Sequence, residues 1–348
     1  MFGHPEFDGH EQVVFACDPA VGLRAIVALH STALGPAFGG CRMWAYASEA
    51  DALTDALRLS RGMTYKAAIC ELPLGGGKSV ILGDPRRDKT REILRAMGRV
   101  VESLGGRYVI ADDIGTTLDD LRVMRGVTAH TAAATPSAQQ PLAVTAYGVL
   151  MAIRAAVWQR FGRDDLAGLE VAVQGLGNVG FPLCGHLYEA GAELVVSDID
   201  PARVTGAESA FGARGVATDA IYEQQVDVFA PCALGASLNQ RTIPRLGARI
   251  VCGGANNQLA AAGDDAALAA RGILYVPDYL ANAGGVIDFH QEAIDDRPEA
   301  VLRAVGRIRE IAERVLNEAE ASGRTPLQVA DAIVRQRLQA AAEARRAL

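Results

Sequence analysis

Apolar residues recur along the first part of the chain with two periods, which predict strands and a helix. Two runs of β-branched and apolar residues, at 12–16 (QVVFA) and 24–29 (RAIVAL), flank the turn-forming sequence DPAVG and predict two paired strands. The polar segment at 48–51 (SEAD) is a variant of the helix-capping box, and apolar side chains follow it at helical spacing over 53–63. We therefore expect a helix that places Lys66 near its C-terminal end.

The next stretch predicts another group of strands and a helix. The glycines and lysine at 75–78 predict a turn that leads into a strand at 79–82. A helix at 90–104 and a strand at 107–110 follow. Asp113 comes shortly after that strand and is expected at its carboxyl end.

The pattern changes in the second half of the chain. The small, polar and Pro-containing run at 131–144 predicts a connection between domains, and a helix is expected from 145 to about 160. Strands are then predicted at 170–174, 193–197, 226–230 and 249–251, with helices starting at 178 and 201. This alternation is typical of βαβ units with a parallel sheet. The helical, Ala/Arg-rich tail from 301 onward is assigned to neither domain by its composition.

Composition narrows the class of protein. The chain has 348 residues, half of them apolar, and a net charge of −7. The apolar content excludes a largely disordered protein, and the acidic balance argues against nucleic-acid binding. No apolar run approaches the roughly 20 residues of a membrane span, and the N-terminus lacks the apolar core of a signal peptide. We expect a cytoplasmic protein of about two domains, with no nucleic-acid or membrane partner.

Cysteines and histidines do not indicate a metal centre. The six cysteines include no C-x-x-C pair, and the six histidines show no ligand spacing. We expect reduced thiols and no bound metal.

A glycine pattern after the strand at 170–174 predicts a dinucleotide site. Gly175, Gly177 and Gly180 form G-x-G-x-x-G at the opening of a helix, where the backbone N–H groups favour a pyrophosphate. The next strand ends at Asp198, whose carboxylate would bind the ribose 2′-hydroxyl and repel a 2′-phosphate. The cofactor is therefore expected to be NAD. The residues predicted to contact it here are Gly175, Gly177, Asn178, Val179, Gly180 and Asp198.

Two lysines and one aspartate in the first half of the chain are candidates for substrate binding and proton transfer. One lysine can hold a substrate carboxylate as a fixed charge, and a second can act as a base when its surroundings favour its neutral form. A carboxylate near them can pass protons. Taken singly, Lys66, Lys78 and Asp113 would more often be solvated surface groups, and neither composition nor spacing favours a chemical role over that interpretation.

Long stretches of the sequence nevertheless resemble one family. They are LGPAFGGCRMW (34–44), GMTYKAAICELPLGGGKSVI (62–81), LGGRYVIADDIGT (104–116), TAYGV (145–149), VQGLGNVG (173–180), APCALG (230–235), GGANNQLA (253–260) and PDYLANAGGVI (277–287). The chain resembles the Glu/Leu/Phe/Val amino-acid dehydrogenase family, most closely its leucine, valine and phenylalanine branch.

The resemblance implies a fold and a domain division. The expected fold is α/β, with an N-terminal substrate and oligomerisation domain, a Rossmann NAD-binding domain and the active site in a cleft between them. We place the first domain at 1–134, with helices from about 312–348 returning to it, and the second at 135–311. The family usually forms homo-oligomers, so we expect one here.

The resemblance also implies roles for individual residues. Lys66 of MTYK looks like the lysine that binds the α-carboxylate, and Lys78 of GGGK looks like the lysine that activates water. Asp113 resembles the aspartate that carries protons to and from the substrate nitrogen. Further residues carried over are Gly39 and Gly40 in the substrate site, Asn256 between substrate and nicotinamide ribose, and Thr145 and Asn282 on the cofactor side.

The implied reaction is the NAD-dependent, reversible oxidative deamination of an apolar L-amino acid to a 2-oxo acid and ammonium. By the same resemblance, Phe38 occupies the position of a lysine in the glutamate-specific branch, where that lysine pairs with the side-chain carboxylate of the substrate. A phenyl ring cannot make this pair. We expect an apolar pocket made by Phe38, Ala111, Val286 and Phe289. Two phenyl rings would either shrink it toward valine-sized side chains or stack on an aromatic substrate, and the sequence leaves both open.

Three departures from the family pattern keep alternatives open. The run at 139–143 (QQPLA) replaces a usual Gly-Asp/Asn-Pro-Ser-Pro sequence, Cys41 replaces a threonine and Asp112 a glutamate. Cys41 suggests sensitivity to thiol reagents. The altered run motivates a dehydrogenase of amines or unusual amino acids on the same fold. A non-catalytic, NAD-binding regulatory paralogue is a third hypothesis, which the presence of Lys66, Lys78 and Asp113 disfavours.

Overall fold

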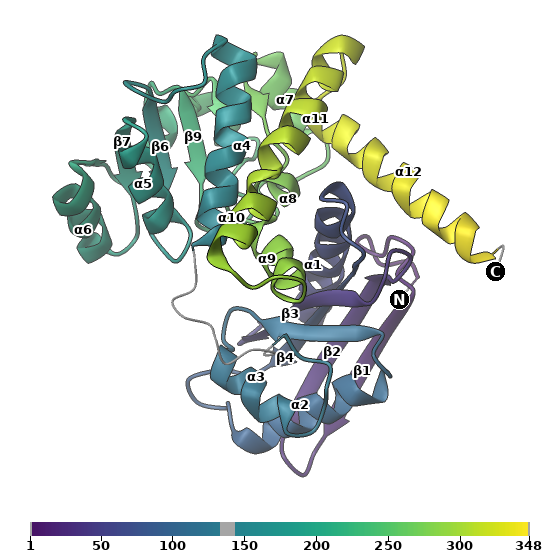
Figure 1. Ribbon diagram of the computed structural model, residues 1–348. Helices are drawn as coiled ribbons and strands as arrows, with labels where there is room; N and C mark the ends of the chain where they lie inside the picture. The colour runs from purple at the N-terminus through teal and green to yellow at the C-terminus, as the bar shows by residue number, and fades with distance from the viewer. Residues whose placement is uncertain (1, 133–142, 347–348) are drawn as a thin grey trace. The chain divides into compact units, whose positions relative to one another are not determined.

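The computed structural model describes residues 2–132 and 143–346. The chain forms two compact units, Met1–Gln140 with Val334–Leu348, and Pro141–Ile333 (Figure 1). The boundaries expected from the sequence, at 134/135 and at about 312, stay predictions.

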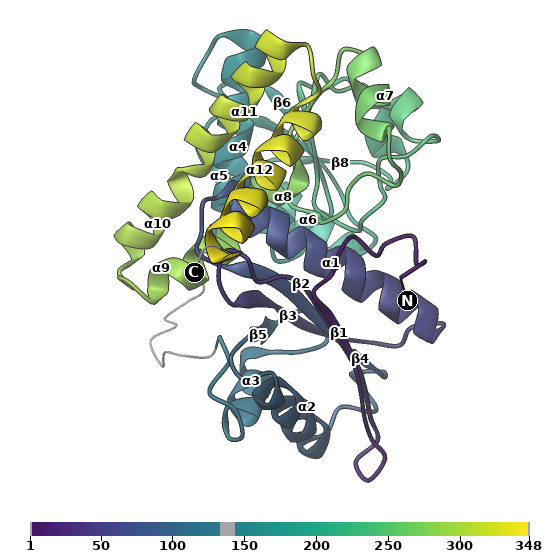
Figure 2. The ribbon, with the colours of Figure 1, turned by 90° about the vertical axis from the view of Figure 1, so that its right-hand side faces the viewer.

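The first unit is a five-stranded mixed sheet with helices on both faces. Its strands are β1 (Gln12–Asp18), β2 (Leu23–Ser31), β3 (Ala37–Trp44), β4 (Gly75–Leu82) and β5 (Tyr108–Asp112), in the order β1-β2-β4-β3-β5. The helices are α1 (Glu49–Ile69), α2 (Arg91–Ser103) and α3 (Leu118–Arg125). Helix α1 covers one face of the sheet, while α2 and α3 cover the other (Figure 2).

The order of strands follows from the local sequence. The predicted pair at 12–16 and 24–29 forms the antiparallel β1 and β2, and the Ser48 side chain caps α1 by accepting from the backbone N–H of Asp51. Strand β3 runs parallel to both of its neighbours, β4 and β5. Because parallel strands end at the same edge, the residues after β5 lie near the carboxyl ends of β3 and β4.

The turn predicted at 75–78 is wrong, because these residues begin β4. A Cβ at Gly76 would lie 2.0 Å from the backbone nitrogen of Thr64 in α1, and one at Gly77 would lie 2.8 Å from the ring of Tyr108. The glycines are therefore part of a crowded central strand, where a helix and a ring approach the backbone closely. Strand β3, with the sequence AFGGCRMW, was not predicted either.

The second unit contains an all-parallel sheet. Its strands are β6 (Glu170–Gln174), β7 (Glu193–Ser197), β8 (Arg214–Gly215), β9 (Val228–Pro231), β10 (Ile250–Val251) and β11 (Leu274–Tyr275), in the order β11-β10-β9-β6-β7-β8. This is the 3-2-1-4-5-6 order of a doubly wound dinucleotide-binding fold. The expected α/β class with a Rossmann-type second domain is confirmed.

The second half of the chain also forms a series of helices. They are α4 (Val144–Phe161), α5 (Gly180–Glu189), α6 (Pro201–Phe211), α7 (Asp264–Ala270), α8 (Asp278–Ala281), α9 (Gly284–Glu292), α10 (Pro298–Gly306), α11 (Ile308–Ser322) and α12 (Pro326–Arg346), with short 3₁₀ turns at Ala220–Glu223 and Ile243–Arg245. Helix α11 packs along α4 within the second unit, whereas the residues of α12 from Val334 onward are grouped with the first unit.

Candidate active site

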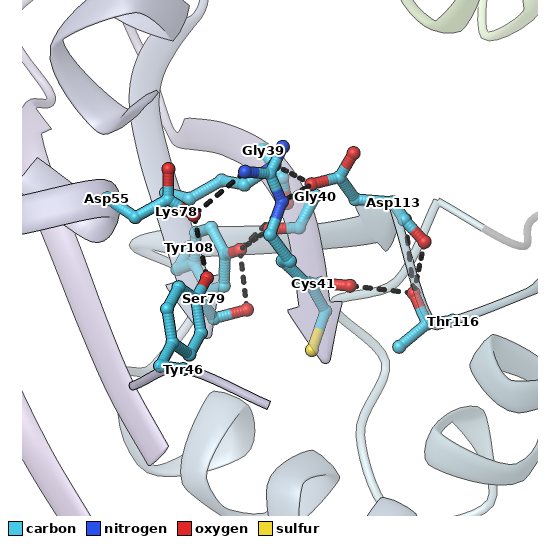
Figure 3. Close-up of polar contacts among 11 residues, drawn as sticks. Gly39, Gly40, Cys41, Tyr46, Asp55, Lys78, Ser79, Tyr108, Asp113 and Thr116 are labelled. Atoms are coloured by element: carbon cyan, nitrogen blue, oxygen red, sulfur yellow. Dashed lines mark hydrogen bonds and ion pairs between the residues drawn. The ribbon is translucent and has the colours of Figure 1, made fainter. Parts of the chain in front are cut away.

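A buried lysine and a carboxylate form the centre of the candidate site in the first unit (Figure 3). Lys78 lies within β4, and Asp113 directly follows β5. Lys78 Nζ donates to Asp113 Oδ2 at 2.6 Å, and Lys78 is only 5% exposed. Burial raises the pKa of Asp113, but attraction by Lys78 and Arg42 outweighs burial and holds this pKa well below its usual range. The structure thus brings together two residues that composition and spacing alone did not distinguish from solvated surface groups.

Arg42 of β3 contacts the same carboxylate, and the sequence analysis did not single it out. Its Nε donates to Asp113 Oδ2 at 3.0 Å, and its Nη1 donates to Oδ2 of Asp55, in α1, at 2.8 Å. The hydroxyl of Tyr46 donates to the same Asp55 oxygen at 2.6 Å. The signal in the sequence was the place of Arg42 within the family-like stretch 34–44.

Gly39 and Gly40 lie on β3 where neighbouring groups leave no room for a side chain. A Cβ at Gly39 would lie 1.8 Å from the carbonyl oxygen of Gly77 on β4. A Cβ at Gly40 would lie 2.7 Å from Cβ of Asp113 and 3.1 Å from Nζ of Lys78. Gly40 is therefore in direct contact with the ion pair.

Cys41 follows these glycines but is not an accessible thiol. The residue is fully buried, and burial raises the pKa of its thiol to about 12. Reaction with thiol reagents requires an exposed thiolate. The sensitivity suggested by the sequence is therefore wrong.

The other residues assigned to the substrate side of the first unit lie on three elements. Lys66 is half-buried in the last turn of α1. Phe38 of β3 is 6% exposed, and Ala111 of β5 pairs with Gly40 across the parallel ladder. A buried phenyl ring supplies an apolar surface that offers no partner to a charge.

The glycine loop of the second unit has the shape of a phosphate site. It joins the end of β6 to the start of α5, and Gly175 adopts φ +90°. A Cβ at Gly180 would lie 1.8 Å from the carbonyl oxygen of Gly175, so the helix can approach the loop only with glycine here. The loop residues Asn178 and Val179 lie directly before α5, whose N-terminal N–H groups suit an anion.

Asp198 stands at the end of β7 beside this loop. Its Oδ2 accepts from the backbone N–H of Leu176 at 2.7 Å, and its side chain is 6% exposed. Arg203, in the first turn of α6, places Nη1 3.8 Å from Asp198 Oδ2. A hollow of about 530 Å³ is lined by Gly177, Asn178 and Arg203 among others. A carboxylate at the end of the second strand, next to a glycine loop, is the type of group that could accept from ribose hydroxyls.

Asn256 and Asn282 form a second polar group in the same unit. Asn282 follows α8, is 4% exposed, and donates from Nδ2 to Asn256 Oδ1 at 2.8 Å. Its own Oδ1 is buried and has no hydrogen-bond partner among the described residues, and the N–H of a bound carboxamide would supply one. Thr145 lies in the first turn of α4, where a Cβ at Gly285 would be 3.6 Å from its Oγ1.

For the remaining predicted residues, the structure gives their element and burial. Val286 and Phe289 lie in α9, with Val286 buried and Phe289 partly so. Residues 139–142 of the divergent run lie outside the described residues, and Ala143 directly precedes α4.

Across residues 2–132 and 143–346, every helix is too short or too polar to span a membrane. The same residues include no group of three or more His, Cys, Asp or Glu side chains arranged to hold a metal ion.

Comparisons with known proteins agree over nearly the whole chain. Residues 10–130 match the family model described as "Glu/Leu/Phe/Val dehydrogenase, dimerisation domain", and residues 197–346 match "Glutamate/Leucine/Phenylalanine/Valine dehydrogenase". Leucine dehydrogenase of Bacillus subtilis (strain 168) is 46% identical over 342 residues, which are 97% of this chain and 94% of that protein. Phenylalanine dehydrogenase of Bacillus thermotolerans is 43% identical over 341 residues, covering 95% and 89%. The crystal structure of L-tryptophan dehydrogenase from Nostoc punctiforme superposes with a TM-score of 0.80 at 43% identity, covering 96% and 97%.

Proposed function

The chain belongs to the Glu/Leu/Phe/Val dehydrogenase family, and we propose that it uses NAD to deaminate an apolar L-amino acid through Lys66, Lys78 and Asp113. As an amino-acid dehydrogenase it is an oxidoreductase acting on CH–NH₂ donors. Its reaction is the oxidative deamination of apolar amino acids, of the leucine and phenylalanine dehydrogenase type. The observation that carries our assignment of residues is the buried contact of 2.6 Å between Lys78 and Asp113.

The chemistry divides among these side chains. Lys66 binds the α-carboxylate as a fixed charge, which orients Cα. Bound NAD would take the hydride from Cα and leave a cationic imine. Lys78 removes a proton from the water that adds to this imine, and Asp113 carries protons to and from the nitrogen until ammonium leaves. Amino acid, NAD⁺ and water thereby give 2-oxo acid, ammonium, NADH and one proton.

The proposal that NAD is the cofactor is supported by two sets of residues in the second unit, the glycine loop with Asp198 and the pair of asparagines. The loop from Gly175 to Gly180 would hold the pyrophosphate, and Asp198 would bind the adenosine ribose. Asn256 and Asn282, with Thr145, would hold the nicotinamide end, where Asn282 Oδ1 lacks a partner.

The substrate side chain is proposed to be uncharged. Phe38 and Ala111 of the first unit, with Val286 and Phe289 of the second, would form its pocket. Burying the γ-carboxylate of glutamate there without a partner would cost several kcal/mol. We therefore propose leucine-, valine- or phenylalanine-like substrates and exclude glutamate.

The two units are proposed to divide the work. The first would be the substrate and oligomerisation domain, and the second the dinucleotide-binding domain. We also propose a homo-oligomer assembled through the first unit. Its β1 is an edge strand that exposes Phe15 by 61%, and residues 10–130 match a model described as a dimerisation domain.

The function is tested by following NADH consumption with ammonium and a panel of 2-oxo acids. The panel contains the oxo acids of valine, leucine, phenylalanine, tryptophan and glutamate. We expect fast oxidation with at least one apolar member and none above background with 2-oxoglutarate. Preference for 2-oxoglutarate would contradict the apolar pocket. Silence across the panel with NADH still bound would contradict the proposed substrate class and favour an unusual donor.

Cofactor choice gives a second expected result. Asp198→Asn keeps an acceptor for the Leu176 N–H but removes the negative charge, and Arg203 then faces a 2′-phosphate unopposed by that carboxylate. We expect the Kd for NADPH, measured by fluorescence titration, to fall by roughly ten- to a hundredfold. The Kd for NADH should rise, because an ionised acceptor for the ribose hydroxyls is lost.

Arg203 provides the control for this expectation. Adding Arg203→Ala to Asp198→Asn should reverse the gain in NADPH affinity and leave the NADH affinity of the single variant nearly unchanged. An unaltered Kd for NADPH in Asp198→Asn would show that Asp198 does not set the cofactor preference.

A further inference from the structure

One carboxylate oxygen is shared by two cations of different chemistry. Asp113 Oδ2 accepts from Lys78 Nζ at 2.6 Å and from Arg42 Nε at 3.0 Å. A lysine can release its proton within the working range of an enzyme, whereas an arginine stays protonated. When Lys78 gives up its proton during the reaction, Arg42 therefore remains as a cation on the same oxygen.

Arg42 is itself fixed from a second side. Its Nη1 donates to Asp55 Oδ2 at 2.8 Å, and Tyr46 donates to that oxygen at 2.6 Å. Burial raises the pKa of the Tyr46 hydroxyl, with Asp55 adding to the rise, so the phenol stays a neutral donor. The side chains of Arg42 and Asp55 are 17% and 24% exposed, which limits screening by water.

The elements that supply these groups are separate. Arg42 comes from β3, Asp55 from α1, and Asp113 from the end of β5. The guanidinium directs Nε–H and Nη1–H toward carboxylates on different elements in one fixed plane, whereas a lysine has all its N–H donors on a single nitrogen at the end of a flexible stem. The guanidinium therefore connects Asp55 of α1 to Asp113 through two hydrogen bonds.

We propose that Arg42, held by Asp55 and Tyr46, is a positioning residue that keeps Asp113 ionised and oriented whether or not Lys78 carries its proton. The proposal rests on the roles of Lys78 and Asp113 in the proposed function. Arg42 acts through Asp113.

The charges around the pair give the direction of its effect. Among the described residues, the charged groups around Asp113 are Lys78 from β4, Arg42 from β3 and the adjacent Asp112, with Asp55 behind Arg42. Three titratable groups whose pKa values burial raises also interact with Asp113 electrostatically: Cys41, Tyr46 and Tyr108. Loss of one proton from the Lys78–Asp113 pair makes this buried cluster one charge more negative. Arg42 offsets that negative charge, so proton loss is harder without it.

The pH profile of kcat/KM for an apolar amino acid with NAD tests this role. Deamination requires the pair to release a proton, so activity is lost on the acidic side. In Arg42→Gln we expect this acidic limb to move to higher pH by about one to two units. We also expect kcat at neutral pH to fall by roughly tenfold to a hundredfold. The Kd for NADH should stay unchanged, because the glycine loop belongs to the other unit.

Three further variants separate positioning from folding. Arg42→Lys keeps the charge but loses the fixed planar arrangement of the two donors. Compared with Arg42→Gln, it should therefore restore part of the position of the acidic limb and less of kcat. Tyr46→Phe removes one donor to Asp55 and should give a smaller shift in the same direction. Arg24→Gln is the matched control, because its side chain is 60% exposed and pairs only with Glu49 among the ion pairs of the described residues; it should leave the profile as it is.

The outcomes are distinguishable from failure of the proposed function. An inactive wild type would contradict the proposed function, and the present inference with it. An active wild type whose acidic limb stays in place in Arg42→Gln would overturn the present inference alone. Equal loss of activity at every pH would show that Arg42 only supports the fold.

Discussion

Replacing Lys78 with alanine is expected to reduce turnover by roughly 10³- to 10⁴-fold, because the proposed base for the attacking water is removed. The alanine also leaves Asp113 without its donor at 2.6 Å. Steady-state rates of NAD reduction with the best substrate of the panel measure the effect. NADH binding should persist, since the loop from Gly175 to Gly180 lies in the second unit.

Lys78→Arg distinguishes a base from a structural cation. Arginine keeps the positive charge that Asp113 contacts, but it does not lose its proton at working pH. We expect it to be nearly as inactive as Lys78→Ala while unfolding at a temperature closer to that of the wild type. Activity near the wild-type level in either variant would contradict the assigned mechanism.

The second unit was the more predictable half of the fold. Apolar runs bounded by turn residues predicted strands at 170–174 and 193–197, which are the bounds of β6 and β7 in the structure. Each strand is buried and short, and the helix between them starts at a glycine loop whose spacing has a physical cause. Local sequence pattern and tertiary structure agree here, so the sequence alone predicts these strands correctly.

In the first unit, local sequence pattern did not predict strand β3 or the beginning of β4. Glycine normally weakens a strand, so the pattern gave a turn at 75–78 and no strand at 37–44. The glycines are required by what packs against them: Thr64 against Gly76, and the Tyr108 ring against Gly77. These contacts join residues distant in sequence, and no local window contains them.

The candidate site divides in the same way. Lys78 and Asp113 were singled out because family-like motifs surround them, while spacing alone left them as surface groups. Lysine is rare in this chain, which has it only at 66, 78 and 89, and arginine cannot replace it as a base. Arg42 lies 71 positions from Asp113, so neither its charge nor its spacing indicated the contact.

Gly40→Ala is expected to reduce kcat/KM by roughly a hundredfold or more although it replaces no ionisable group. The added methyl would lie 2.7 Å from Cβ of Asp113, 2.8 Å from the carbonyl oxygen of Asp112 and 3.1 Å from Nζ of Lys78. The backbone oxygen cannot rotate away, so β5 must shift and the ion pair must lengthen. Because the pair works at hydrogen-bond distance, a shift of a few tenths of an ångström changes both partners at once.

Gly62→Ala is the matched control for this variant. Gly62 lies within α1, where an added Cβ meets nothing within 4 Å. Alanine in place of glycine within a helix stabilises by roughly 0.5–1 kcal/mol, so this variant should keep its activity and unfold at a slightly higher temperature. Near-native kcat/KM in Gly40→Ala would mean that the contact between Lys78 and Asp113 is not the reacting geometry, since the methyl group cannot enter without disturbing it.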